Sequence, residues 1–222
     1  MIIGRGGMEV KNTSELKYYG KALAINFKKF LDRAVDKYNN LFTLTPEESK
    51  GVLLEISQEM EEKGDYKGAG EIYKKILVSE PNSVNTLFKL GKVYVNIGQF
   101  DEARDALKKV VVLDGTIAQA FYLLGSAHFA LDENKEAMAA LKKAVELNPG
   151  YAEAYYKIGL IFDARSEHDQ AIEAYLKTIS FSPDFLKAYQ SLGFAYESKG
   201  MRDEAVKYFK KAIDIEERRG GK

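Results

Sequence analysis

Few residues in this sequence could do covalent or acid–base chemistry. It has two histidines, His128 and His168, and no cysteine, which excludes thiol nucleophiles, disulfides and thiolate zinc sites. Neither histidine has another four residues away, and there is no nucleophile elbow, phosphate-binding loop or carboxylate cluster at ligand spacing. We therefore predict a protein that is not an enzyme and that holds no metal and no cofactor.

The overall composition excludes further classes of protein. The 222 residues include 33 basic and 33 acidic ones, so the chain has no global attraction for nucleic acid or anionic lipid. A hydrophobic content of 45% is enough for a substantial core. No apolar stretch approaches the roughly 20 residues that span a bilayer. We expect a cytoplasmic protein with no transmembrane segment, in which residues 1–13 are a disordered leader.

The elements that position the remaining side chains recur with a period of 34 residues. A small residue takes one position of each period: Ser57, Gly91, Gly125, Gly159 and Gly193. An alanine takes another: Ala69, Ala103, Ala137, Ala171 and Ala205. Three of the four prolines share a third phase: Pro81, Pro149 and Pro183. The period defines five units: 50–83, 84–117, 118–151, 152–185 and 186–219.

Each unit has the pattern of two helices joined by a turn. In 152–185, apolar residues recur at steps of three and four from Tyr155 to Phe162, and again from Ala171 to Ile179 after a polar break. Proline follows the second helix because it cannot continue one. We expect the glycine position to let the first helix approach the second closely, opposite the alanine position.

This order of aromatic or Leu, Leu/Ile-Gly, aromatic, Ala, aromatic, Ala and Pro resembles the tetratricopeptide repeat (TPR) family. The resemblance covers residues 50–219 and implies an all-α, right-handed α-solenoid. Its first helices would line a concave groove and its second helices the convex face. His128 stands where the family has an aromatic residue, so we expect a structural role for it. His168 lies in a predicted turn and is expected at the solvated surface.

Two unit ends depart from the pattern. Gly115 stands where the proline of 84–117 belongs, either as a helix-capping glycine or as a hinge between 50–114 and 115–219. The last unit also lacks its proline, and only "RRGGK" follows. Its final face is therefore solvated by its own lysines and glutamates or covered by another molecule.

Residues 14–49 form a degenerate leading repeat. Pro46 precedes Pro81 by 35 residues, and Ala34 and Tyr38 fall at second-helix positions, but no turn signal marks off a first helix. Apolar residues instead follow one helical face over 14–41, as one long helix or a pinched pair. We call this face the N-terminal stripe; it contains Leu16, Tyr19, Leu23, Phe27, Phe30, Ala34, Tyr38 and Leu41.

An apolar stripe of this length has to be buried against another surface, and three such surfaces are possible. It could cap unit 50–83, lie on a membrane surface, or dock on a second copy of the chain. A head-to-tail contact between copies would propagate into a ring or filament. We predict that the stripe mediates homo-oligomerisation.

The groove is the predicted binding surface for other proteins. In the TPR family, the fifth, ninth and twelfth residues of each first helix line it. With neighbouring lysines this predicts a partner-binding set: Phe88, Lys89, Lys92, Val95, Tyr122, Phe129, Tyr156, Lys157, Leu160 and Phe194. Such an aromatic surface is typical of binding to a helix or extended peptide, although single rings could tuck between helices. The lysine–asparagine pair of chaperone-binding TPR proteins is absent.

The flanks "LKYYGKALAINFKKFLDRAV" and "YFKKAIDIEERR" resemble those of the magnetosome-associated TPR proteins of magnetotactic bacteria. This resemblance implies a non-enzymatic scaffold that self-assembles through its leading repeat and coats the cytoplasmic face of the magnetosome membrane. It also implies a two-part solenoid with a flexible junction, which Gly115 would suit. The implied partners are the chain itself, other proteins bound through the groove or the convex face, and membrane proteins of the magnetosome, with no nucleic acid.

Two other functions fit the repeats. One is a monomeric adaptor that binds a peptide or helix of a secretion, pilus or signalling partner. The other is a repeat arm that delivers substrates to a separate enzyme.

Overall fold

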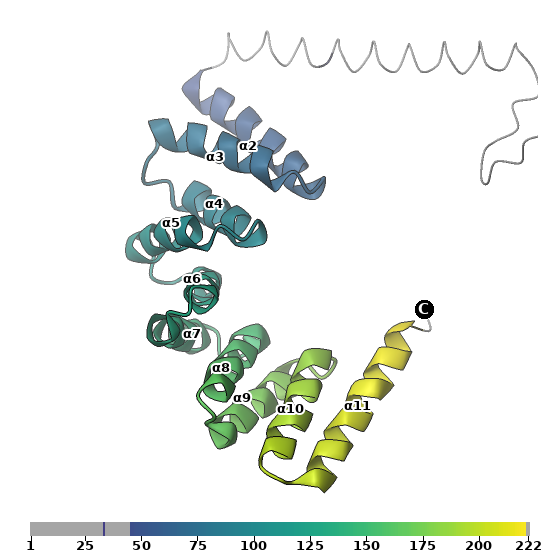
Figure 1. Cartoon of the computed structure of the whole chain (residues 1–222). Coiled ribbons are helices and arrows are strands. Elements are labelled where there is room, and N and C mark those ends of the chain that lie inside the picture. Colours follow the sequence, from purple (N-terminus) through teal and green to yellow (C-terminus); the bar gives the residue numbers. More distant parts are fainter. Residues whose placement is uncertain (1–32, 34–44, 221–222) are drawn as a thin grey trace, which may run out of the picture. The chain divides into compact units, whose positions relative to one another are not determined.

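A computed structural model describes residue 33 and residues 45–220 of the chain (Figure 1). The chain divides into two units, Met1–Val52 and Leu53–Lys222, and nearly all described residues belong to the second. The expected leader, 1–13, and the N-terminal stripe lie outside the described residues. The predictions made for them stay predictions.

Every regular element of the described residues is an α-helix, which confirms the predicted all-α fold. The helices are α2 (Pro46–Glu62), α3 (Tyr66–Ser79), α4 (Val84–Asn96), α5 (Phe100–Leu113), α6 (Ala118–Ala130), α7 (Asn134–Leu147), α8 (Ala152–Ala164), α9 (His168–Phe181), α10 (Leu186–Ser198) and α11 (Arg202–Gly220). Among them, none combines the length and the apolar character needed to cross a membrane.

Successive helices pair into hairpins that stack on one another (Figure 1). α4 packs on α5, α6 on α7, α8 on α9 and α10 on α11, and each second helix also contacts the first helix of the next hairpin. The first helices α4, α6 and α8 touch in sequence, so they share one face of the stack. This arrangement is the predicted TPR α-solenoid.

The turn inside each hairpin contains one residue in the left-handed backbone conformation. The φ angles are +79° at Gly64, +76° at Gly98 and +74° at Gly200. Asp132 and Ser166 hold the same position, at φ 58°, although a side chain disfavours this conformation. The 34-residue period therefore extends to the backbone of the turn.

The glycine position lets the two helices of a hairpin approach, but its partner differs from the expected one. A Cβ on Gly159 would lie 2.3 Å from Cε1 of Tyr175, and one on Gly125 would lie 2.7 Å from Cγ of Leu141. The side chain opposite the glycine is thus the large residue four positions after the alanine. The expectation that alanine fills this role was wrong; alanines such as Ala171 are fully buried elsewhere in the helix interface.

The junction at Gly115 is closed by local hydrogen bonds. The backbone N–H and the hydroxyl of Thr116 both donate to Asp114 Oδ1, at 2.9 and 2.6 Å. Gly115 does not need a glycine-only φ, and a Cβ there would meet only Val111 O at 3.6 Å. The hinge remains a prediction.

The first proline of the repeat region begins a helix. Pro46 is the first residue of α2, and Thr45 and Glu48 form a capping box in which Thr45 N donates to Glu48 Oε2 at 2.9 Å. Whether Pro46 also ends a preceding second helix, as predicted, depends on residues outside the described ones. α2 starts four residues before unit 50–83 does.

Candidate functional site

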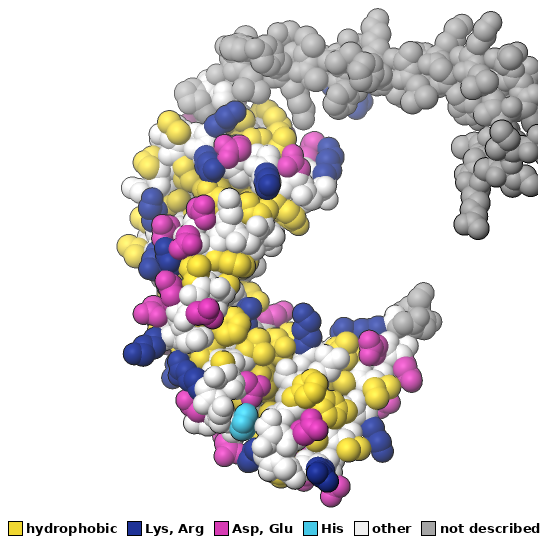
Figure 2. Space-filling model, in the orientation of Figure 1, with side chains coloured by type: hydrophobic (Ala, Val, Ile, Leu, Met, Phe, Trp, Pro, Cys, Tyr) yellow, Lys and Arg dark blue, Asp and Glu magenta, His cyan; other side chains and the backbone are white. Residues whose placement is uncertain are grey.

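The ten residues of the predicted partner-binding set all lie on the first helices. α4 carries Phe88, Lys89, Lys92 and Val95; α6 carries Tyr122 and Phe129; α8 carries Tyr156, Lys157 and Leu160; and α10 carries Phe194. We call the face shared by these first helices the inner face. In Figure 2, hydrophobic side chains appear along the inner side of the stack, while charged side chains of both signs alternate along its outer edge. Partner binding at these residues stays a proposal.

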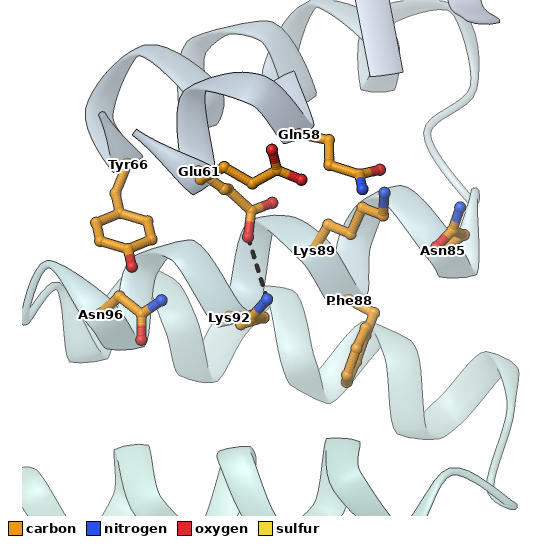
Figure 3. A pocket seen from close by; sticks show the side chains of 9 residues that line it. Gln58, Glu61, Tyr66, Asn85, Phe88, Lys89, Lys92 and Asn96 are labelled. Carbon is orange, nitrogen blue, oxygen red and sulfur yellow. Dashed lines mark hydrogen bonds and ion pairs between the residues drawn. The ribbon is translucent and has the colours of Figure 1, made fainter. Parts of the chain in front are cut away.

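A hollow of about 470 Å³ opens between α2 and α4 (Figure 3). Its polar wall contains an ion pair, in which Lys92 Nζ lies 3.1 Å from Glu61 Oε2. The buried hydroxyl of Tyr73 donates to the other carboxylate oxygen, Glu61 Oε1, at 2.5 Å. Burial and this hydrogen bond raise the pKa of Tyr73 to about 12. Each carboxylate oxygen of Glu61 therefore has its own partner, Lys92 for one and Tyr73 for the other.

The same arrangement recurs three periods later. Tyr175 is fully buried, and its hydroxyl donates to Asp163 Oδ2 at 2.6 Å. Burial, above all, and the carboxylate of Asp163 raise the pKa of Tyr175. Here the second neighbour of the carboxylate is a histidine, with His168 Nδ1 3.5 Å from Asp163 Oδ1. The predicted solvated turn position of His168 was wrong, because it begins α9 and is half-buried.

Two aromatic residues of the inner face pack against the aromatic residue that precedes the next first helix. The ring of Tyr122 lies 4.9 Å from that of Tyr151, and Tyr156 lies 5.0 Å from Phe185, measured between centroids. Both rings are half-buried. Phe194 differs, because it is 60% exposed while its ring meets the edge of Phe209. A partner at the inner face could therefore contact only part of the rings of Tyr122 and Tyr156, but most of the ring of Phe194.

Lys157 has the most unusual surroundings of the lysines in the predicted set. Its Nζ lies 5.4 Å from the centre of the Phe129 ring, a cation–π arrangement. Burial, together with the charge of Lys187, lowers the pKa of Lys157. The ammonium group is thus half-buried beside an aromatic ring and a second cation.

Comparisons with known proteins place this geometry in a family. A family model described as "Anaphase-promoting complex, cyclosome, subunit 3" matches residues 62–144, a TPR repeat model matches 127–164, and a tetratricopeptide repeat model matches 152–185 and 186–219. The last two ranges coincide with units defined by the 34-residue period. No curated protein matches the chain.

Solved structures give a closer likeness. A crystal structure of MamA is 56% identical, covers 75% of this chain and 98% of its own, and superposes with a TM-score of 0.71. The chain belongs to the MamA family. MamA 41-end from Desulfovibrio magneticus RS-1 is 27% identical, with coverage of 76% and 95% and a TM-score of 0.70. YrrB, titled "a TPR protein with an unusual peptide-binding site", is 26% identical, with coverage of 73% and 84% and a TM-score of 0.62. As a member of a TPR family, this MamA-like chain is a scaffold for protein–protein interaction.

His128 has a structural role in this MamA-family chain. It is 3% exposed, and its Nδ1 bonds to Glu133, which also pairs with Arg104 at 3.1 Å. Arg104 belongs to α5 and Glu133 to the turn before α7, so the network links two repeats. The expected structural histidine is confirmed, whereas its carboxylate partner was not predicted.

The sequence analysis also missed both tyrosine–carboxylate pairs. Glu61 with Tyr73, and Asp163 with Tyr175, have the same separation of 12 residues and lie 102 residues apart. The sequence did contain a signal for these pairs. Counted within each 34-residue unit, an acidic residue at position 12 comes with a tyrosine at position 24 in two units. In the last unit, Glu197 comes instead with Phe209. Each of these carboxylates lies on a first helix and accepts a hydrogen bond from a buried tyrosine of the second helix of its hairpin.

Proposed function

We propose that this MamA-family chain self-assembles into a non-enzymatic scaffold that coats the cytoplasmic face of the magnetosome membrane and recruits other proteins through its TPR surfaces. The observation that carries this proposal is the 56% identity to MamA over 98% of that structure. The magnetosome location is supported by the resemblance of both flanks to magnetosome-associated TPR proteins.

The end of the stack supports self-assembly. Val206 and Ile213 of α11 are 50% and 53% exposed. Residues at the position of Val206 in the two preceding units, Met138 and Ile172, are only 8% and 7% exposed, because the next hairpin covers them. The last helix therefore presents an inter-repeat face that no further repeat of this chain covers in the described residues. We call it the C-terminal face.

With the N-terminal stripe as predicted from the sequence, the chain would carry two apolar surfaces of the kind that packs against a helix, the stripe and the C-terminal face. Contact between the stripe of one copy and the C-terminal face or groove of the next is heterologous. Such contacts extend into rings or filaments instead of stopping at a dimer.

Size-exclusion chromatography with light scattering on the full chain tests the assembly. We expect the unaltered protein to form large homo-oligomers at micromolar concentration. The double substitution Leu23→Glu with Phe27→Glu places charges in the N-terminal stripe and should reduce the mass to that of a monomer. The matched control, Lys21→Glu with Lys28→Glu, alters residues between the stripe positions and should leave the large species in place.

Two results would contradict the proposal. One is a monomer for the unaltered chain across the micromolar range. The other is equal loss of assembly in both variants, which would indicate a general effect of charge. The location is tested separately with a fluorescent fusion in a magnetosome-forming bacterium, where a uniformly diffuse signal would exclude the membrane coat.

A monomeric peptide adaptor is the second candidate. Its specific support is the likeness at 26% identity to YrrB, whose title names a peptide-binding site. Monomeric protein that still binds peptides at the inner face would favour this candidate over the scaffold.

A further inference from the structure

The last helix of the described stack, α11, leaves open the positions at which earlier repeats join (Figure 1). Val206 and Ile213, the apolar residues of the C-terminal face, are 50% and 53% exposed. At the position of Ile213 in the preceding unit, Ile179 is half-buried and packs against a cluster that contains Tyr189 of the next first helix. Within the described residues, nothing takes the place of that next helix on α11.

Charged residues border the two apolar residues on the same side of α11. Arg202 lies four residues before Val206, and Glu217 lies four residues after Ile213. Steps of four and seven residues keep these four side chains on one face of a helix. Arg202 and Glu217 are exposed, and neither belongs to an ion pair in the part of the chain that the structure describes.

The length of α11 gives this face its second charged end. α5, α7 and α9 have 14 residues each, whereas α11 has 19. Glu217 occupies the position at which the earlier units carry a proline or glycine after the helix has ended: Pro81, Gly115, Pro149 and Pro183. The loss of the proline in the last unit therefore extends the helix and adds a carboxylate to the C-terminal face.

The C-terminal face is complementary to itself when two copies lie antiparallel. Positions 202 and 217, and positions 206 and 213, share one midpoint between residues 209 and 210. An antiparallel second α11 therefore places Arg202 opposite Glu217 at both ends and Val206 opposite Ile213 between them. A parallel second helix would place equal charges opposite each other, which is unfavourable.

We propose that the C-terminal face binds the C-terminal face of a second copy, as a two-fold pair of antiparallel α11 helices with an Arg202–Glu217 ion pair at each end. An ion pair also links neighbouring repeats within the chain, where Arg104 meets Glu133 at 3.1 Å. The inference deepens the proposed function and rests on it, because it assigns one occupant to the C-terminal face of the scaffold and leaves the groove to the N-terminal stripe. Stripe contacts would form rows of copies, and paired C-terminal faces would join two rows.

Analytical ultracentrifugation of the full chain tests the pair. One helix face from each copy makes a small interface, so we expect a dissociation constant of about 0.1–1 mM. The stripe contact is removed by Leu23→Glu with Phe27→Glu. In that background, the chain should be monomeric at micromolar concentration and should form dimers as the concentration approaches the millimolar range.

The two charged residues allow a charge swap in the same background. Arg202→Glu alone, or Glu217→Arg alone, places like charges opposite each other at both ends and should raise the dissociation constant at least about tenfold. Both substitutions together restore opposite charges and should restore the dimer. Each change also suits the helix dipole, so the fold should not be weakened. Lys211→Glu is the matched control, because it changes the charge equally at an exposed position on another side of α11.

Disulfide formation tests the antiparallel register independently. The chain contains no cysteine, so Val206→Cys and Ile213→Cys proteins each carry a single thiol. Under mild oxidation, an equimolar mixture of the two proteins should form covalent dimers several times faster than either protein alone. The reason is that only the mixed pair brings position 206 opposite position 213 within the reach of a disulfide.

Four outcomes would overturn the pair. They are a monomer up to millimolar concentration, equal weakening by Lys211→Glu and Arg202→Glu, no recovery in the double charge swap, or covalent dimers that form as fast from one single-cysteine protein as from the mixture. Light scattering on the chain with its unaltered stripe separates this inference from the scaffold proposal. Large species at micromolar concentration without pairing at millimolar concentration reject the pair alone, whereas pairing in a chain that forms no large species rejects the stripe-mediated scaffold alone.

Discussion

The lysines at two places on the inner face, Lys92 on α4 and Lys157 on α8, have opposite electrostatic surroundings. Between α2 and α4, Glu61 neutralises Lys92 and is anchored by the hydroxyl of Tyr73. On α8, Lys157 lies over the ring of Phe129 of α6 and belongs to no ion pair among the described residues, and burial together with the charge of Lys187 lowers its pKa. Both regions are built on the same 34-residue pattern, so their different charge surroundings come from single residues at equivalent positions.

This difference shows how a repeat protein can separate stability from binding. The Glu61 region resembles a satisfied core network, in which each polar group has a partner. Among the residues that the structure describes, Lys157 belongs to no ion pair, and a half-buried cation of this kind is unfavourable for the isolated fold and suits a surface that receives an anionic group. Substitutions in equivalent positions of the two regions should therefore have unequal effects.

The largest difference is expected for the glycines at the hairpin interface. Gly159→Ala places a methyl group against the rigid ring of Tyr175, whereas Gly91→Ala meets the flexible side chain of Leu107 at 2.6 Å. Overpacking of this kind costs roughly 1–3 kcal/mol, and the ring can yield less than the leucine. We expect Gly159→Ala to lower the free energy of unfolding by about 3 kcal/mol and Gly91→Ala by about 1 kcal/mol. Urea denaturation measures both, and equal losses would contradict the packing described.

A smaller difference is expected for the tyrosine–carboxylate pairs. Tyr175→Phe leaves Asp163 without its buried donor and should cost about 2 kcal/mol. Tyr73→Phe should cost less, because Lys92 still neutralises Glu61. Thermal unfolding of the two variants measures this order, and the reverse order would indicate that Lys92 contributes little.

The same tyrosines predict the response of stability to alkaline pH. An unfolded tyrosine ionises near pH 10, whereas folded Tyr73, with its pKa raised to about 12, stays protonated. Its contribution is therefore complete below pH 10 and is lost as the pH rises toward 12. Tyr73→Phe should flatten the decline in unfolding free energy between pH 10 and 12, as measured by urea titrations. An unchanged slope would contradict the buried hydroxyl.

The smallest effects are expected for the lysines themselves, and they should have opposite signs. Lys92→Met breaks a partly exposed ion pair and should lower the melting midpoint by about 2 °C or less. Lys157→Met removes a half-buried cation that has no carboxylate partner in the described part of the chain, and it should raise the midpoint slightly. Differential scanning calorimetry compares the two midpoints. A higher midpoint for Lys92→Met would contradict the claim that Lys92 stabilises the fold while Lys157 destabilises it.

The period of 34 residues predicted the helices, their pairing and the inner face, because repeated apolar spacing dictates which side of each helix is buried. It could not predict what faces Gly159, since the way the two helices cross places Tyr175, and not Ala171, against it. It also did not predict that Pro46 begins a helix, which a proline before an acidic residue can do as well as follow one.

The partner-binding set was located on the correct helices from position alone. Its energetics were not predictable from composition, because Lys92 and Lys157 look alike in sequence. Only the contacts show that Lys92 lies beside Glu61, whereas Lys157 lies over the ring of Phe129. Pairing depends on side-chain direction, which the 34-residue period does not specify.

The most direct measurement is the titration of Lys157 in the full chain. Lysines labelled by reductive methylation with ¹³C-formaldehyde give separate NMR signals, and Lys157→Arg identifies the one that belongs to residue 157. Burial and the charge of Lys187 lower the pKa of Lys157, so its signal should titrate at lower pH than most other lysine signals. Substituting Lys187 by Met should move it back upward. A signal that titrates with the majority and ignores Lys187→Met would contradict an unpaired, half-buried cation on the inner face.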